Sequence, residues 1–261
     1  MDARLRRLFV VSLLPLALGA GPTHRTTNFL VEAPTAEIAR KVAERAEECR
    51  SLTARSWLGR ELRPWARPCP IKVKLTGGEA GGMTSFEFGE TGVVDRVMSV
   101  EGSLDRLLAA AVPHEVTHTV FADFFGGPMP RWADEGASML SEDGRELQRQ
   151  ERIVRVGLER GSSLALGRLF SLEEYPGDLL GFYGQGYSVA RFLVEMGGRP
   201  RFLAFVKQGA GNGWDLAVRD HYGLANVKEL DRAWRAWHEV RIAAQPRRTV
   251  GDATRAQSAE E

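Results

Sequence analysis

The hydrophobic pattern of the chain changes once, near Ser103, and this change limits the folds that the chain can adopt. Before it, alternation of apolar and polar residues predicts strands at 26–34, 71–75, 83–88 and 93–100. Helical spacing before the change occurs in one long segment, 35–58. After it, the segments are helical in pattern, at about 104–112, 114–125, 131–142, 144–160, 182–196, 199–208 and 226–242. Strands followed by helices predict an α+β fold, in which a small mixed sheet with one long helix precedes a mainly helical lobe.

Local signals define the ends of two of these helices. Thr35 is a suitable N-cap for the long helix, and Gly59 ends it. Pro113 lacks an N–H group and should kink or restart the helix that surrounds it. The run Gly126–Gly127–Pro128 should stop that helix.

Composition narrows the class of protein. The chain has 261 residues, 43% of them hydrophobic, which is enough for one sizeable core or for two lobes. Its formal charge is +1, and nothing resembles the basic footprint of a nucleic-acid-binding protein. The sequence predicts an α/β lobe over 25–112, a helical lobe over 113–242 and a disordered polar tail over 243–261.

The N-terminus has the pattern of a secretory signal peptide over residues 1–20. Arg4, Arg6 and Arg7 precede an apolar run at about 8–18, and small residues follow it. The run is short for a membrane span, which takes roughly 20 residues. We therefore expect export to the periplasm or the extracellular space, with an uncleaved N-terminal anchor as the alternative.

The chain contains two cysteines, Cys49 and Cys69. In an exported protein, an isolated pair most simply forms a disulfide, which here would join the long helix to the next strand. The alternative is that both are buried thiols. Their spacing matches no zinc motif.

The segment 113–118 reads PHEVTH and carries the clearest chemical signal. Residues four apart lie on the same face of a helix, so His114 and His118 can bind one metal ion. Glu115 then lies beside the metal, where it can take a proton from a water molecule. Two ordinary histidines on a surface helix would give the same pattern, so a third ligand is needed.

The helix predicted at 131–142 offers that ligand. Glu135 lies in its early turns, and an antiparallel return would bring it to the level of His118. Asp134 is the rival candidate for the third ligand. Because the two residues are adjacent on the helix, they cannot easily both face the metal. A further helix offers Tyr183 and Tyr187, whose phenols could donate a hydrogen bond to a developing oxyanion.

These residues resemble the gluzincin peptidases, a zinc-dependent group with a zincin-like fold. The resemblance rests on HEVTH followed by Glu135 in WADEG, and on YGQGYSVARFLVEMGG, which is similar to the aminopeptidase branch. It implies that His114, His118 and Glu135 hold Zn²⁺, that Glu115 is the general base and that Tyr183 stabilises the oxyanion. It also implies a cleft between the two lobes, lined by a strand around Met98–Val100 that pairs with an extended substrate.

The sequence departs from this family at two points. It contains no Gly-x-Met-x-Asn stretch of the kind that aminopeptidases use to bind a free N-terminus. Met139 also occupies the position of an aspartate that follows the glutamate ligand in thermolysin. A partner that orients His114 is still expected, with Ser138, Asp123 and Asp134 as candidates.

The sequence thus predicts an exported zinc metallopeptidase that acts on a peptide or protein substrate. It predicts no nucleic-acid partner, and membrane contact only through an uncleaved signal. The leading alternative is an inactive binding module with a zincin-like fold. A third possibility is a membrane-surface protein that uses Leu230, Trp234 and Trp237 of the last helix, although such a stripe more often packs on a core.

Overall fold

The computed structural model describes residues 21–244, so the predicted signal peptide and the tail beyond 244 lie outside the described residues. Five strands form one mixed sheet in the order β1-β2-β3-β5-β4. Pairing is antiparallel between β1 and β2 and between β4 and β5, and parallel in the two inner pairs. The strands are β1 (Thr23–Arg25), β2 (Phe29–Glu32), β3 (Cys69–Leu75), β4 (Gly81–Gly89) and β5 (Gly92–Gly102).

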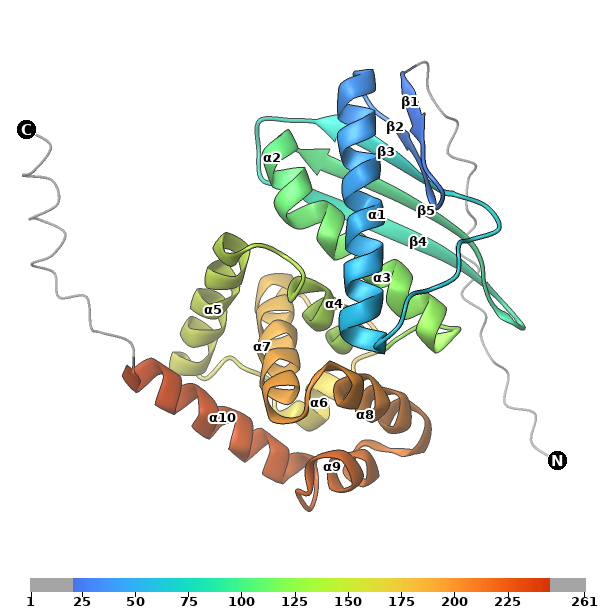
Figure 1. Ribbon diagram of the computed structural model, residues 1–261. Helices are drawn as coiled ribbons and strands as arrows, with labels where there is room; N and C mark the ends of the chain where they lie inside the picture. The colour runs from blue at the N-terminus through green and yellow to red at the C-terminus, as the bar shows by residue number, and fades with distance from the viewer. Residues whose placement is uncertain (1–20, 245–261) are drawn as a thin grey trace, which may run out of the picture.

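Helix α1 (Ala36–Leu58) covers one face of this sheet (Figure 1). As predicted, the Thr35 side chain accepts a hydrogen bond from the backbone N–H of Ile38, and Gly59 ends the helix in the left-handed conformation. The apolar side of α1 packs on strand residues to form a first core, which includes Phe29, Val31, Val42, Ala46, Ile71 and Met98.

Two features of this lobe differ from the predictions. The strand expected over 26–34 is shorter, because the chain turns at Thr26 and only Phe29–Glu32 forms β2, which pairs with β1 just before the turn. The expected disulfide is also absent, since Cys49 and Cys69 are both free and buried. Burial raises the pKa of Cys49 to about 11 and that of Cys69 to about 12, so both behave as small apolar core residues.

The helix that carries HEVTH connects the two halves of the molecule. After α2 (Leu104–Arg106), a π-helical turn at Leu107–Ala111 leads into α3 (Val112–Phe125). The π turn ends two residues before Pro113, which is the residue expected to disturb the helix, and the chain continues into α3 without a break. As predicted, Gly126 ends α3 in the left-handed conformation.

The rest of the described chain is helical, which confirms the predicted α+β fold. Two short helices, α6 and α9, were not predicted. The helices are α4 (Arg131–Met139), α5 (Gly144–Glu159), α6 (Leu166–Phe170), α7 (Leu179–Gly197), α8 (Arg199–Asn212), α9 (Trp214–Tyr222) and α10 (Val227–Ala244).

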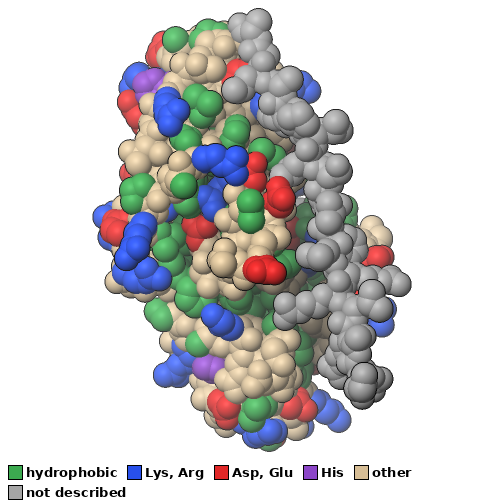
Figure 2. All heavy atoms as spheres, turned by 90° about the vertical axis from the view of Figure 1, so that its right-hand side faces the viewer, with side chains coloured by type: hydrophobic (Ala, Val, Ile, Leu, Met, Phe, Trp, Pro, Cys, Tyr) green, Lys and Arg blue, Asp and Glu red, His purple; other side chains and the backbone are tan. Residues whose placement is uncertain are grey.

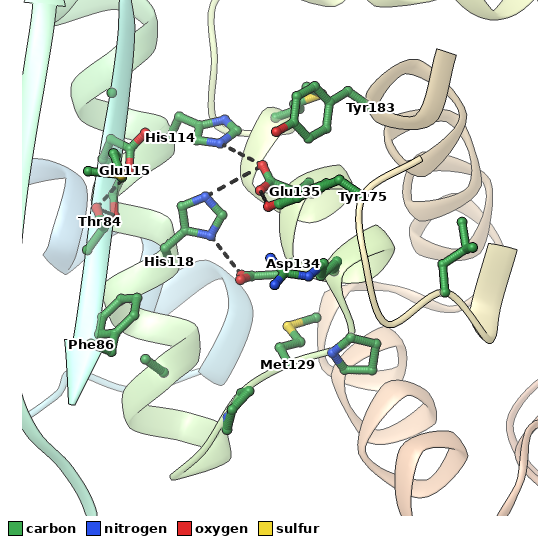
Figure 3. A pocket seen from close by; sticks show the side chains of 18 of the residues that line it. Thr84, Phe86, His114, Glu115, His118, Met129, Asp134, Glu135, Tyr175 and Tyr183 are labelled. Carbon is green, nitrogen blue, oxygen red and sulfur yellow. Dashed lines mark hydrogen bonds and ion pairs between the residues drawn. The ribbon is translucent and has the colours of Figure 1, made fainter. Parts of the chain in front are cut away.

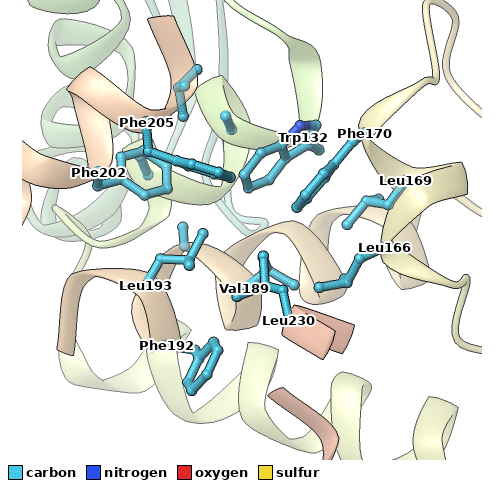
Figure 4. Close-up of a cluster of buried hydrophobic side chains, with 14 of the residues drawn as sticks. Trp132, Leu166, Leu169, Phe170, Val189, Phe192, Leu193, Phe202, Phe205 and Leu230 are labelled. Atoms are coloured by element: carbon cyan, nitrogen blue, oxygen red, sulfur yellow. The ribbon is translucent and has the colours of Figure 1, made fainter. Parts of the chain in front are cut away.

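These helices enclose a second core that is rich in aromatic residues (Figure 4). Trp132 stacks on Phe170 with ring centroids 4.4 Å apart. Leu230 and Trp234 of α10 are fully buried in the same cluster, so the apolar stripe of the last helix packs on the core. Within residues 21–244, no helix is both long and apolar enough to cross a membrane. On the face shown in Figure 2, acidic and basic side chains are interspersed.

Candidate metal centre

The structure brings three of the predicted residues together at one point between the two lobes. His114 and His118 project from α3 with ring centroids 4.8 Å apart, and Glu135 projects from α4 towards them (Figure 3). Oε2 of Glu135 lies 3.4 Å from Nε2 of His114 and 3.8 Å from Nε2 of His118. One donor atom from each residue lies within 4.8 Å of the others.

The second nitrogen of each imidazole is held by a carboxylate. Nδ1 of His114 lies 2.6 Å from Oε1 of Glu142, which follows α4 in a tight turn. Nδ1 of His118 lies 2.8 Å from Oδ1 of Asp134 and 3.2 Å from Oγ of Ser138. Because both Nδ1 atoms have these partners, both Nε2 atoms are directed at the same space.

These contacts show the positions of the alternative third ligand and of the candidate partners of His114. Asp134 sits behind His118 instead of joining the group of donor atoms. The partner of His114 is Glu142, which was not among the candidates. The third candidate, Asp123, is far from this role, because it accepts hydrogen bonds from Trp65 and Arg96.

Charges around the histidines favour a cation. Burial alone would lower the pKa of His118, but the carboxylate of Asp134 opposes it and the pKa rises to about 9. The pKa of His114 also rises, because hydrogen bonds to Glu135 and Glu142 outweigh the effect of burial. Burial would raise the pKa of Glu135, but the two histidines lower it to about 2. A divalent cation that replaced the protons on the two imidazoles would be stabilised by the same carboxylates.

The donor set therefore fits a zinc ion. Two imidazole Nε2 atoms and one carboxylate oxygen are the ligands of the catalytic type of zinc site, in which the protein leaves one coordination position open. The carboxylates on the Nδ1 atoms are the partners that metal-binding histidines usually have.

Glu115 lies beside this group and contacts the sheet instead of the three donor atoms. Its Oε2 accepts a hydrogen bond of 2.6 Å from Oγ1 of Thr84 on β4. Gly82, two residues earlier on the same strand, faces the same side chain, and a Cβ atom there would lie 2.6 Å from Cγ of Glu115. The glycine thus leaves the space that the carboxylate occupies.

Two tyrosines reach the centre from its other side. The hydroxyl of Tyr183, on α7, points towards His114 and Glu135 (Figure 3). Tyr175, in the connection 171–178 between α6 and α7, donates a hydrogen bond of 2.7 Å to Oε1 of Glu135. Burial and the nearby charge of Glu135 raise the pKa of both phenols, so both stay protonated donors. Tyr187 is fully buried and bonds to Glu151 and Arg191, away from the centre.

A cavity of about 1580 Å³ extends from the centre in both directions and is called the cleft below. Its His114 side is lined by polar and charged residues, namely Glu142, Glu146, Arg149 and Gln150. Its His118 side is lined mainly by apolar residues, which include Phe86, Phe88, Met129, Pro130 and Trp214.

The strand along the cleft is β4. The expected segment Met98–Val100 belongs to β5, which lies between β3 and β4, and both of its end residues are buried. Within the described chain, β4 is one of the two edge strands, and residues 81–84, 86 and 88 line the cleft. The strand that contains Met98–Val100 was expected at the cleft from the sequence, but its neighbour in the sheet, β4, lies there.

Comparison with models of known protein families gives no match for this chain. No curated protein matches its sequence either. The support for a function therefore comes from the molecule itself: a mixed sheet lobe, a helical lobe and a group of His114, His118 and Glu135 that is consistent with a zincin-like site.

Proposed function

We propose that this protein is a zinc-dependent metallopeptidase of the gluzincin type. The observation that carries the proposal is the arrangement around α3: His114, His118 and Glu135 offer donor atoms within 4.8 Å of one another. Beside them, Glu115 is held by Thr84 in a place where its carboxylate stays out of the ligand set. A purely structural metal site would not need this additional carboxylate.

The chemistry divides between the bound ion and the residues of the chain. A Zn²⁺ ion at this site would polarise the scissile carbonyl group and lower the pKa of a water molecule. Glu115 takes the proton from that water and delivers it to the nitrogen of the leaving amine. Glu142 and Asp134 fix the ring orientations of His114 and His118, so that both Nε2 atoms stay directed at the ion.

Tyr183 is the residue that we assign to the oxyanion. Its phenol stays protonated, and it points across the cleft towards His114 and Glu135 (Figure 3). A preorganised donor of this kind stabilises negative charge that develops in the transition state. Tyr187, the alternative considered from the sequence, lies outside the cleft lining.

The substrate that we propose is an extended peptide or protein segment that lies along β4. The free edge of this strand presents backbone N–H and C=O groups, which can pair with an added strand. Because β4 also carries Thr84, such pairing would bring a peptide bond close to Glu115. We further propose that the protein acts outside the cytoplasm, as its N-terminal sequence suggests.

The test combines metal content with hydrolysis. Purified full-length protein should contain about one equivalent of zinc and should cleave peptides in a mixed library, and a chelator should abolish cleavage. Glu115→Gln should retain zinc and lose nearly all turnover. Tyr183→Phe should retain zinc and lower kcat by roughly 10²- to 10³-fold, with little change in KM.

Tyr187→Phe is the matched control, because it also removes a phenolic hydroxyl group from α7, but at a residue that does not line the cleft. It should change thermal stability more than kcat. If zinc-loaded wild-type protein cleaves no peptide, the peptidase proposal is wrong and the binding-module alternative takes its place.

A further inference from the structure

A second pocket lies on the sheet lobe and shares no lining residue with the cleft. Its volume is about 520 Å³, and it is formed by the connection between α1 and β3 together with the start of β5. We call it the arginine pocket, because four arginines line it: Arg60, Arg63, Arg67 and Arg96.

The floor of the arginine pocket is held together by cation–π contacts and hydrogen bonds. Two guanidinium groups lie over the Trp65 ring, with Cζ of Arg96 at 3.9 Å and Cζ of Arg50 at 4.4 Å from its centroid. The indole N–H donates to Asp123 at 2.6 Å, and Nη2 of Arg96 donates to the other oxygen of that carboxylate at 2.8 Å. Both arginines are buried, and Nη2 of Arg50 donates to the backbone oxygen of Arg63.

The pocket carries more positive than negative charge. Its acidic lining residues are Asp95 and Asp123, so four arginines face two carboxylates. Within residues 21–244, none of the exposed arginines at 60, 63 and 67 forms an ion pair with a carboxylate. In addition, Nε of Arg96 is buried and has no hydrogen-bond partner among the described residues. The excess of two positive charges matches one dianion.

We propose that the arginine pocket binds a phosphate monoester. Guanidinium groups from several directions suit a group with three acceptor oxygens and a charge near −2 better than they suit a carboxylate, which has two oxygens and a charge of −1. The pocket is larger than a phosphate group alone, and apolar residues complete its lining, namely Leu62, Pro64, Ala66, Val93 and Val94. The organic group that bears the phosphate would contact these residues.

The test uses the full-length protein and isothermal titration calorimetry with phenyl phosphate. The test variant is Arg60→Gln/Arg63→Gln, which removes two exposed charges from the pocket rim. The matched control is Arg152→Gln/Arg160→Gln, which removes two exposed charges elsewhere. We expect binding to wild type and to the control, and at least a tenfold loss of affinity in the test variant. Peptide hydrolysis by the test variant should equal that of wild type.

Two further titrations define the ligand. Inorganic phosphate should bind more weakly than phenyl phosphate, because it lacks the organic group. Vesicles that contain phosphatidic acid test whether the phosphate belongs to a lipid, and binding that the test variant loses would assign that source. Equal affinity of wild type and test variant for phenyl phosphate, or tighter binding of a polyglutamate peptide than of phenyl phosphate, would overturn the proposal.

Discussion

Replacing Gly82 by alanine should disable the proposed catalytic base without removing the metal site. A Cβ atom at this position would lie 2.6 Å from Cγ, 2.7 Å from Oε1 and 2.9 Å from Cδ of Glu115. Ordinary van der Waals contact begins near 3.4 Å, so the Glu115 side chain must retreat by about 0.8 Å. It cannot do so freely, because Thr84 holds its other carboxylate oxygen at 2.6 Å.

The size of the effect follows from this displacement. Misplacing a catalytic group by about 1 Å costs on the order of 10²-fold in rate, or about 2.7 kcal/mol of transition-state stabilisation. The Gly82→Ala variant should therefore show about a hundredfold lower kcat/KM for an internally quenched peptide. Its zinc content should equal that of wild type, because the atoms nearest to the new methyl group all belong to Glu115, which lies outside the group of donor atoms.

The neighbouring glycine provides the control. A Cβ atom on Gly81 would meet nothing within 4 Å, so Gly81→Ala should keep kcat/KM close to the wild-type value. In a Glu115→Gln background, Gly82→Ala should cause little further loss, because both changes act through one side chain. Wild-type kcat/KM in Gly82→Ala, or an equal loss in Gly81→Ala, would refute the positional argument.

Three more predictions follow from other contacts. Glu142→Gln should weaken zinc binding by roughly 10- to 100-fold in a chelator competition, whereas Asp123→Asn should leave it unchanged. Tyr175→Phe should weaken zinc binding by roughly tenfold in the same assay, since its hydroxyl bonds to Glu135 at 2.7 Å. Burial lowers the pKa of His238 from 6.5 to about 4, so its contribution to stability is present above pH 6.5 and is lost as the pH falls towards 4. Denaturant unfolding of His238→Gln should accordingly show a shallower loss of stability than wild type over this pH range.

Much of the fold could be predicted because its signals are local. Thr35 and Gly59 define α1 through capping and backbone conformation, and both act within one helical turn. The order of strands in the sheet is not a local property. Alternation identifies β4 and β5 as strands, but it does not reveal that β4 forms the edge beside α3. The cleft strand was therefore misassigned to Met98–Val100.

The residues of the candidate site also differ in whether local sequence signals reveal them. His114, His118 and Glu135 could be found because helical periodicity and one antiparallel return bring them together. Helical periodicity did not reveal Glu142, because α4 ends at Met139 and a tight turn after it brings Glu142 to His114. Tyr175 carried no local signal either, because it lies in the irregular connection 171–178, whose path depends on packing around it.

The candidate metal centre lies between the two cores, so several separate elements position its residues. Val116 of α3 packs in the sheet core, and Phe121 of the same helix packs in the helical core. The histidines therefore have a fixed position relative to β4 on one side and α4 on the other. Helix α4 is fixed in turn by close backbone contact with α7, since a Cβ atom on Gly136 would lie 2.2 Å from the backbone oxygen of Gly186. Glu135, on the same helix, is thus placed by a contact between backbones, which leaves it less freedom than flexible side chains at the helix interface would allow.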